Sequence, residues 1–354
     1  MNSTINTREK ISIASKFGAF LILLATISIF ITFCNKSENC EYKNDCTFVD
    51  SLNLSTGIDL NGNVLTPGLG VVDPNWRLLN RPPILGVCPI TTINGNAYVI
   101  NYPLPTSTGW VNQPGTAVLA PADLGGSADF GCNNAFNSAD QRVPYIFERP
   151  FCVIENTDVD FNFTFRGDDQ LLFELFNNST NNVVSTSSTY IYPGSTQSWS
   201  ATTLSLTKGS YSIRSYLTNT SSVVLGFTLS GSITTHDGKA ELSNNTSGCC
   251  ENNVITILNI LDNDCDSSFT TGDQIGNGWT FNLKDSNGNI IQTGITDING
   301  NLFFSGLPDG DYTIEIVVQT GWTTLPASGK ISVALSSNAA YTFEFFNCPL
   351  TKHR

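Results

Sequence analysis

The stretch WTFNLKDSNGNIIQTGITDINGNLFFSGLPDGDYTIEIV, residues 279–317, decides the fold of the C-terminal third of this chain. Apolar and polar residues alternate on both sides of Asn287-Gly288 and of Asn299-Gly300. Alternation with a period of two predicts half-buried strands, and Asn-Gly between two such runs is a strong signal of a β-hairpin. A third turn, at 307–310, precedes another alternating run. The stretch therefore predicts consecutive antiparallel strands with two hairpins.

The segments on either side continue this pattern. VITILNIL (254–261) and YTFEFF (341–346) are strand-like, and VDFNFTF (159–165) alternates without a break. No window from 48 to 235 shows sustained helical periodicity, and its short strands are separated by Gly, Asn, Asp and Ser turns. We therefore predict an all-β chain: a jelly-roll-like β-sandwich at 48–235, a polar linker at 236–248 and a smaller immunoglobulin-like β-sandwich at 249–350.

The composition excludes one class of partner and indicates a compartment. Among 354 residues, 17 Lys and Arg oppose 30 Asp and Glu, for a net charge of −13. No basic face can be assembled for a phosphate backbone, so nucleic-acid binding is excluded. The chain has only two histidines, which argues against a His-based catalytic triad and against a zinc site. Abundant Asn, Ser, Thr and Gly with 22 Phe is typical of extracellular β-sandwiches.

The N-terminus carries the pattern of an export signal. Basic residues precede an uncharged apolar run at 17–33. We predict a signal peptide or membrane anchor helix at 1–34 and a linker at 35–47. Cleavage, lipidation at Cys34 and retention as an anchor stay open, because the run lies at the short end of a membrane-spanning helix. In each case the rest of the chain is predicted to be extracellular, with contact to the membrane only through this segment.

Ten cysteines agree with an oxidising compartment, where disulfides form. Zinc is the rival interpretation, but the sequence has no CxxC pair and only two histidines with which to complete a site. Spacing does not fix the connectivity. Our predicted pairings are Cys40–Cys46 and a bridge from Cys249 or Cys250 to Cys265 or Cys348.

The C-terminal stretch resembles a known family. Its motifs are Trp279-Thr-Phe-x-Leu-x-Asp285-x-x-Gly288, Thr296-Asp297-x-Asn299-Gly300 and Phe304-x-Gly306-Leu307-Pro308-x-Gly310-x-Tyr312. They are similar to the B-type repeat of Ser-Asp-repeat surface proteins, which is related to the prealbumin-like B-type modules of collagen adhesins. The resemblance covers about 254–347. It implies an immunoglobulin-like sandwich that serves as a rigid spacer, often stiffened by calcium, and not as a catalyst.

An acidic loop follows the first strand of the second sandwich. Asp262, Asp264 and Asp266 alternate, and Asp273 is the twelfth residue counted from Asp262. Carboxylates at positions one, three, five and twelve can converge on calcium, because a tightly coiled loop turns alternate side chains inward. Two features depart from that pattern: Ser267 stands where a glycine is expected, and position twelve is Asp and not Glu. We predict calcium at these four carboxylates, and the alternative is a solvated acidic turn.

The N-terminal half resembles, more loosely, the galactose-binding-like jelly rolls of exported bacterial proteins, through STGID (55–59), DPNW (73–76) and the segments 144–153 and 166–175. The resemblance implies a carbohydrate-binding-like fold and transfers no contact residue. Aromatic rings exposed at a surface can stack on sugars. We therefore predict ligand binding at Trp199, Tyr190 and Tyr192, which lie in a polar, turn-rich stretch. The alternative is that these rings belong to the core, as most sandwich tryptophans do.

The predicted function is that of a non-catalytic, exported bacterial surface protein. The first sandwich binds an extracellular glycan or a surface protein, and the second is a calcium-stiffened spacer. No catalytic residue is predicted. One alternative is a structural envelope or matrix protein without a small ligand. Another is a jelly-roll hydrolase of extracellular polysaccharide, whose acid and base would be carboxylates such as Glu148 and Glu155.

Overall fold

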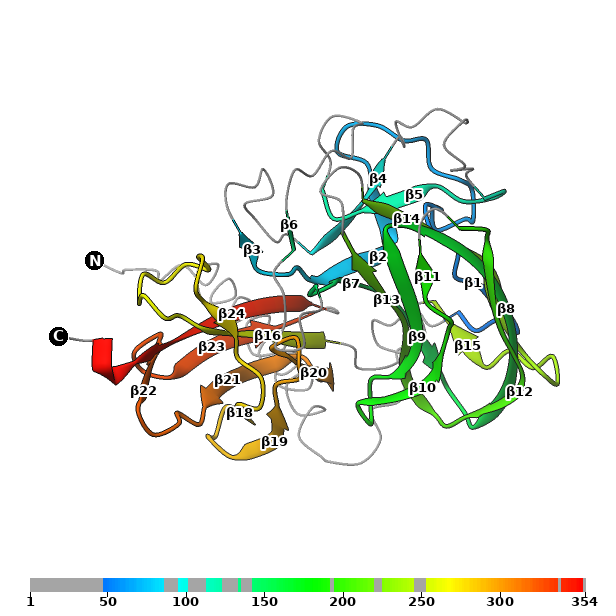
Figure 1. Ribbon diagram of the computed structural model, residues 1–354. Coiled ribbons are helices and arrows are strands. Elements are labelled where there is room, and N and C mark those ends of the chain that lie inside the picture. The colour runs from blue at the N-terminus through cyan, green and yellow to red at the C-terminus, as the bar shows by residue number, and fades with distance from the viewer. Residues whose placement is uncertain are drawn as a thin grey trace, which may run out of the picture. The chain divides into compact units, whose positions relative to one another are not determined.

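The computed structural model describes residues 47–85, 95–100, 113–122, 133–134, 142–191, 194–219, 225–244, 253–336 and 339–352. They belong to one compact unit, Asn44–Arg354. All of their regular structure is β except for a 3-10 turn at Leu350–Lys352, so the all-β prediction is confirmed (Figure 1). Within these ranges no helix has the length and apolar character needed to cross a bilayer. The predicted export segment lies outside them.

The first sandwich is built from one 13-stranded sheet with the order β10-β9-β13-β7-β2-β4-β5-β14-β8-β12, to which β1, β11 and β15 add at the sides. A separate pair is formed by β3 (Ile84–Leu85) and β6 (Asn133–Asn134). The strands of the large sheet are β1 (Ser51–Asn53), β2 (Val72–Asn80), β4 (Asn96–Ile100), β5 (Val118–Ala120), β7 (Tyr145–Val153), β8 (Thr157–Asp168), β9 (Gln170–Asn177), β10 (Asn182–Thr186), β11 (Tyr190–Ile191), β12 (Gln197–Leu206), β13 (Gly209–Thr218), β14 (Gly226–Thr235) and β15 (Leu242–Ser243).

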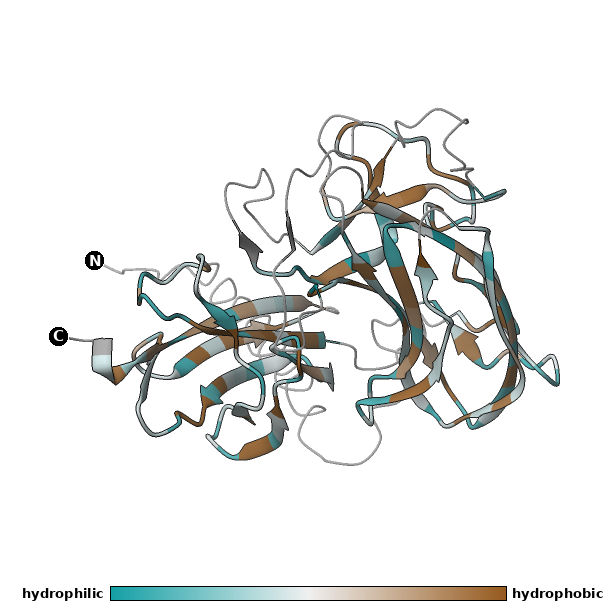
Figure 2. Cartoon of the chain, viewed as in Figure 1, coloured by the Kyte–Doolittle hydropathy of each residue, from teal (hydrophilic) through white to brown (hydrophobic). Residues whose placement is uncertain are grey.

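Period-two alternation forms the core of this sandwich. In β8, Val159, Phe161, Phe163 and Phe165 are buried, while the residues between them are partly or fully exposed. These side chains join buried residues from β1, β2, β4, β5, β7, β9, β12, β13 and β14 in a single apolar cluster. Because strands from both ends of the sheet order share one cluster, the sheet curls around its own apolar face. Figure 2 shows the resulting alternation of brown and teal along the strands.

The end of the first sandwich lies beyond the predicted boundary at 235. β15 falls inside the predicted linker 236–248, yet it pairs with β7, and Leu242 also bridges to Val49. Leu242 is fully buried in the first core. The chain therefore returns to close the first sandwich before it crosses to the second.

The second sandwich has two facing sheets, β17-β16-β24-β22, with β20 also paired to β16, and β19-β18-β21-β23. β16 and β24 run parallel, with Val254 beside Ala340 and Leu261 beside Asn347. The core between the sheets includes Trp279, Phe281 and Phe345. The strands are β16 (Asn253–Leu261), β17 (Gln274–Ile275), β18 (Thr280–Lys284), β19 (Ile290–Ile295), β20 (Asn301–Leu307), β21 (Gly310–Ile316), β22 (Trp322–Leu325), β23 (Lys330–Leu335) and β24 (Ala340–Pro349).

One turn motif, Asp-x-Asn-Gly-Asn, occurs three times, beginning at Asp59, Asp285 and Asp297. In each copy an oxygen of the Asp carboxylate accepts the backbone N–H of the first Asn at 2.8–2.9 Å and that of the last Asn at 2.8 Å. The glycine of each copy takes a left-handed φ of 84°, 83° or 73°, which only glycine adopts without strain. The Asp side chain and the glycine together fix the turn.

The same turn leads to two topologies. At Asn287-Gly288 it joins β18 to β19, and these strands pair as the predicted hairpin. At Asn299-Gly300 the hairpin prediction is wrong, because β19 and β20 belong to different sheets. A Cβ on Gly294 would lie 2.4 Å from a methyl carbon of Leu302, so the two strands pack across the sandwich instead of side by side.

Candidate functional site

The acidic loop lies between β16 and β17 and gathers three of the four predicted carboxylates. One oxygen each from Asp262, Asp264 and Asp273 lies within 4.8 Å of the others. Asp262 is buried, Asp273 partly buried and Asp264 exposed. Asp266 does not belong to this group, since its carboxylate turns to accept the N–H of Ser268 at 2.8 Å.

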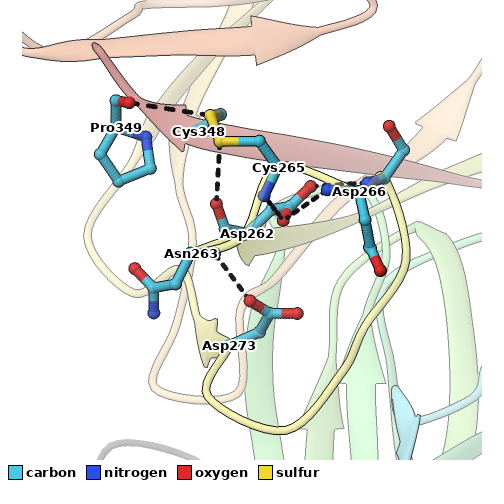
Figure 3. The surroundings of a disulfide bond; sticks show 8 residues. Asp262, Asn263, Cys265, Asp266, Asp273, Cys348 and Pro349 are labelled. Carbon is cyan, nitrogen blue, oxygen red and sulfur yellow. Dashed lines mark hydrogen bonds between the residues drawn. A yellow bond between two sulfur atoms is a disulfide. The ribbon is translucent and has the colours of Figure 1, made fainter. Parts of the chain in front are cut away.

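Backbone amides hold two of these carboxylates in place. Asp262 accepts the N–H groups of Cys265 at 2.6 Å and Ser267 at 2.8 Å. Asp273 accepts those of Asn263 at 2.6 Å and Thr270 at 2.7 Å. Figure 3 shows Asp262 and Asp273 within the coil of the loop. The loop is therefore organised around the carboxylates, and the third, Asp264, accepts the Thr270 hydroxyl at 3.1 Å.

The backbone makes a tight turn at Ser267, the position where the calcium-loop pattern expects a glycine. Ser267 has a φ of 67°, and Cys265 a φ of 64°. Left-handed conformations cost a residue with a Cβ about 1–2 kcal/mol. The hydrogen bonds that the backbone N–H groups of Cys265 and Ser267 donate to Asp262 offset that cost. The loop therefore keeps its tight turn although Ser267 stands where a glycine is expected.

The electrostatics of the loop reflect crowded negative charge. Burial raises the pKa of Asp262, and a hydrogen bond with the neighbouring Asp264 carboxyl adds to the rise, while the amides of Ser267 and Cys265 oppose it. Burial penalises a charged carboxylate, and so does a second carboxylate at close range. A bound cation would remove both penalties, because it supplies the opposite charge.

A disulfide joins this loop to the last strand. Cys265 in the loop bonds to Cys348 on β24, with the two Cα atoms 5.3 Å apart (Figure 3). The predicted bridge from Cys249 or Cys250 is therefore wrong, because Cys265 and Cys348 pair with each other. Cys152 is also disulfide-bonded. The predicted Cys40–Cys46 bond lies outside the described residues.

The aromatic residues predicted to bind a ligand belong to the core where the structure describes them. Trp199 is 5% exposed, packs on Phe161 and Phe163 with ring centroids 4.9 and 5.6 Å away, and donates its indole N–H to Ser185. Tyr190 is 1% exposed, and its hydroxyl lies 3.1 Å from the carbonyl oxygen of Gly194. Neither ring can stack on a sugar, so the prediction is wrong for both. Tyr192 lies outside the described residues.

The first sandwich contains a buried ionic cluster that sequence reasoning missed. Glu148 on β7 lies directly opposite Arg77 on β2 and Arg214 on β13. Its carboxylate is 2.6 Å from Nη2 of Arg77 and 3.5 Å from Nε of Arg214, and the side chains of Glu148 and Arg214 are completely buried. Burial disfavours the charged carboxylate, but Arg77 and Arg214 outweigh it and lower the pKa of Glu148. Glu148 is enclosed between two arginines and has no exposed side-chain surface on which to meet a substrate, whereas Glu155 is exposed.

Arg214 extends this cluster toward the second sandwich. Its Nη2 donates to Asn178 Oδ1 and to Ser305 Oγ, each at 3.1 Å. Its guanidinium lies 3.5 Å from the ring centroid of Phe176 and 4.7 Å from that of Phe303. The buried charge thus links the first sandwich to β20 of the second.

Comparison with known proteins assigns the second sandwich. A family model described as the SpaA prealbumin-like fold domain matches residues 270–347. The second sandwich is a prealbumin-like module. The match begins inside the acidic loop, three residues before Asp273, and ends one residue before the disulfide-bonded Cys348. No curated protein matches the chain.

Solved structures are similar only in part. The minor pilin GBS52 of Streptococcus agalactiae is 15% identical over 51% of this chain and 84% of its own, with a TM-score of 0.24. The shaft pilin SpaA of Lactobacillus rhamnosus GG is 11% identical over 51% and 86%, with a TM-score of 0.22. An α-L-arabinofuranosidase, MgGH51, is 10% identical over 55% and 31%, with a TM-score of 0.28. Scores this low add nothing to the assignment of the prealbumin-like module and assign no function.

Proposed function

We propose that this chain is a non-catalytic bacterial surface protein. The prealbumin-like module would act as a spacer, and the first sandwich would contact an extracellular partner. The observation that carries the proposal is the family match at 270–347, joined to a disulfide that closes the same module. Disulfides persist in oxidising compartments, and such modules build surface-exposed stalks in the family that the sequence resembles.

Surface location is tested by labelling intact cells that express the full chain with a membrane-impermeant amine reagent. We expect modification of exposed lysines such as Lys239 without lysis. A cytoplasmic protein labelled in parallel serves as the lysis control. Labelling that appears only after lysis would rule out the surface role.

An extracellular glycan or surface protein is the partner class we propose for the first sandwich. Trp199 and Tyr190 cannot provide the contacts, because they are buried. A glycan array probed with the full chain separates the two classes: specific binding supports a glycan, and a blank array removes the glycan from the proposal.

We also propose calcium at Asp262, Asp264 and Asp273. Hard cations prefer carboxylate oxygens, and three of these oxygens already lie close together. Binding to the folded state stabilises it by about 2.7 kcal/mol when free calcium exceeds Kd a hundredfold. We therefore expect the full chain to melt at a higher temperature in calcium than in chelator.

Two isosteric variants locate the calcium effect. Asp264→Asn, at the exposed carboxylate of the group, should abolish the difference between calcium and chelator. Asp266→Asn is the matched control, because its side chain lies outside the group. Equal melting temperatures for the unmodified chain in both buffers would eliminate calcium from the proposal, and equal effects of the two variants would eliminate this site.

A further inference from the structure

β19 is an exposed edge strand. It ends the sheet β19-β18-β21-β23 and pairs only with β18 among the strands that the structure describes. Five of its six residues are exposed, with Ile290 at 55%, Ile291 at 44% and Ile295 at 61%. Figure 2 shows brown segments along it. The unpaired N–H and C=O groups of an edge strand form a template for pairing with another strand, and exposed apolar side chains favour that pairing.

This edge lacks the charges and prolines that usually block such pairing. From Ser286 to Thr296 the chain has no Lys, Arg, Asp, Glu or Pro. At the opposite edge of the same sheet, β23 begins with Lys330, which forms an ion pair with Glu315. A bulge interrupts β19 between Ile290 and Gln292, where the register with β18 shifts. The regular, unprotected part of the edge is therefore Gln292–Ile295.

The hydrogen-bonding direction along β19 fixes which groups face outward. Thr296 donates its N–H to the carbonyl of Trp279, so residue 296 bonds toward β18. In an antiparallel ladder this direction alternates from one residue to the next. Gln292 and Gly294 then also bond toward β18, and Thr293 and Ile295 direct their N–H and C=O groups to the free edge.

We infer that a second copy of this chain binds here, by pairing its own β19 antiparallel to this one. A pairing centred on Thr293 places Thr293 opposite its own copy, so the outward-facing groups of these two residues meet. It places Ile295 opposite Ile291 of the partner subunit, at the bulge. The net charge of −13 makes two copies repel each other, and the charge-free strip at 286–296 is a place where they can meet. Asp297 then lies opposite Asn289 of the partner subunit, and no two carboxylates are paired.

A cysteine at the centre of this pairing tests the inference directly. Residues opposite each other in a hydrogen-bonded antiparallel pair have Cα atoms about 5.5 Å apart, which suits a disulfide. We expect Thr293→Cys in the full chain, kept in solution with a mild detergent, to run as a dimer on a non-reducing gel. Adding reductant before the gel should convert this dimer to monomer. Ser332→Cys is the matched control, because Ser332 is also exposed on an edge strand of this sheet. The unmodified chain corrects for its ten native cysteines.

A charge at the same position provides the second measurement. Thr293→Lys places two ammonium groups opposite each other, and we expect the dimer Kd from sedimentation velocity to rise about tenfold or more. Ser332→Lys should leave the Kd unchanged. A chain that stays monomeric, a Thr293→Cys thiol that reacts with maleimide yet forms no dimer, or a dimer indifferent to Thr293→Lys would each overturn the inference.

Discussion

Removing the Cys265–Cys348 bond will lower the free energy of unfolding of the prealbumin-like module by about 4–5 kcal/mol. The bond joins residues 83 positions apart, so it closes nearly the whole module into one loop. In the chain-entropy model, closing a loop of that length costs the unfolded state this much conformational freedom. The change to make is the double variant Cys265→Ser/Cys348→Ser, and urea denaturation followed by tryptophan fluorescence measures the result.

The double variant is needed because reductant also opens the bond at Cys152. It leaves no unpaired thiol at either position, which a single substitution would. Since the bond ties the loop that carries Asp262, Asp264 and Asp273 to β24, the variant should also weaken any calcium response, whereas the Asp264→Asn variant should keep the disulfide's contribution. A double variant as stable as the parent chain would show that this bond does not constrain the unfolded state.

Sequence predicted the features of this fold that depend on neighbouring residues. Alternation placed Phe161, Phe163 and Phe165 on one buried face, because a strand turns successive side chains to opposite sides. Asn-Gly marked the turns, because each glycine must adopt a left-handed conformation. The spacing of the aspartates predicted three carboxylates that do gather, Asp262, Asp264 and Asp273, because a loop of twelve residues coils locally.

Features set by distant residues could not be predicted in this way. Trp199 lies in a polar stretch, and contacts with rings distant in the sequence, Phe161 and Phe163 on β8 and Phe173 on β9, bury it. The two Asn-Gly turns are alike locally, but the strand after the second pairs with β16, which lies far earlier in the sequence and belongs to the facing sheet. Pairing of Cys265 with Cys348 likewise depends on β16 and β24 running side by side.

Replacing Glu148 by Gln will destabilise the first sandwich by about 3–5 kcal/mol, the usual effect of removing one partner from a buried ion pair. The amide keeps the shape of the side chain but leaves the buried guanidinium of Arg214, and Arg77 beside it, without the opposite charge. Urea denaturation of the full chain at neutral pH measures the loss. Glu155→Gln is the matched control, since that carboxylate is exposed and its removal should change stability by less than about 0.5 kcal/mol.

The pH dependence separates lost charge from altered packing. The pKa of Glu148 is lowered from the ordinary 4.5, so its ionised form stabilises the fold at all pH values above 4.5. This contribution is lost as the pH falls through the lower pKa of the folded state, where the carboxyl in the parent chain takes up a proton. The gap in stability between the parent and Glu148→Gln should therefore be constant from pH 7 to about 5 and narrow in stronger acid. A gap that persists unchanged below that range would mean that the amide disturbs packing and that the charge on Glu148 is not what stabilises the sandwich.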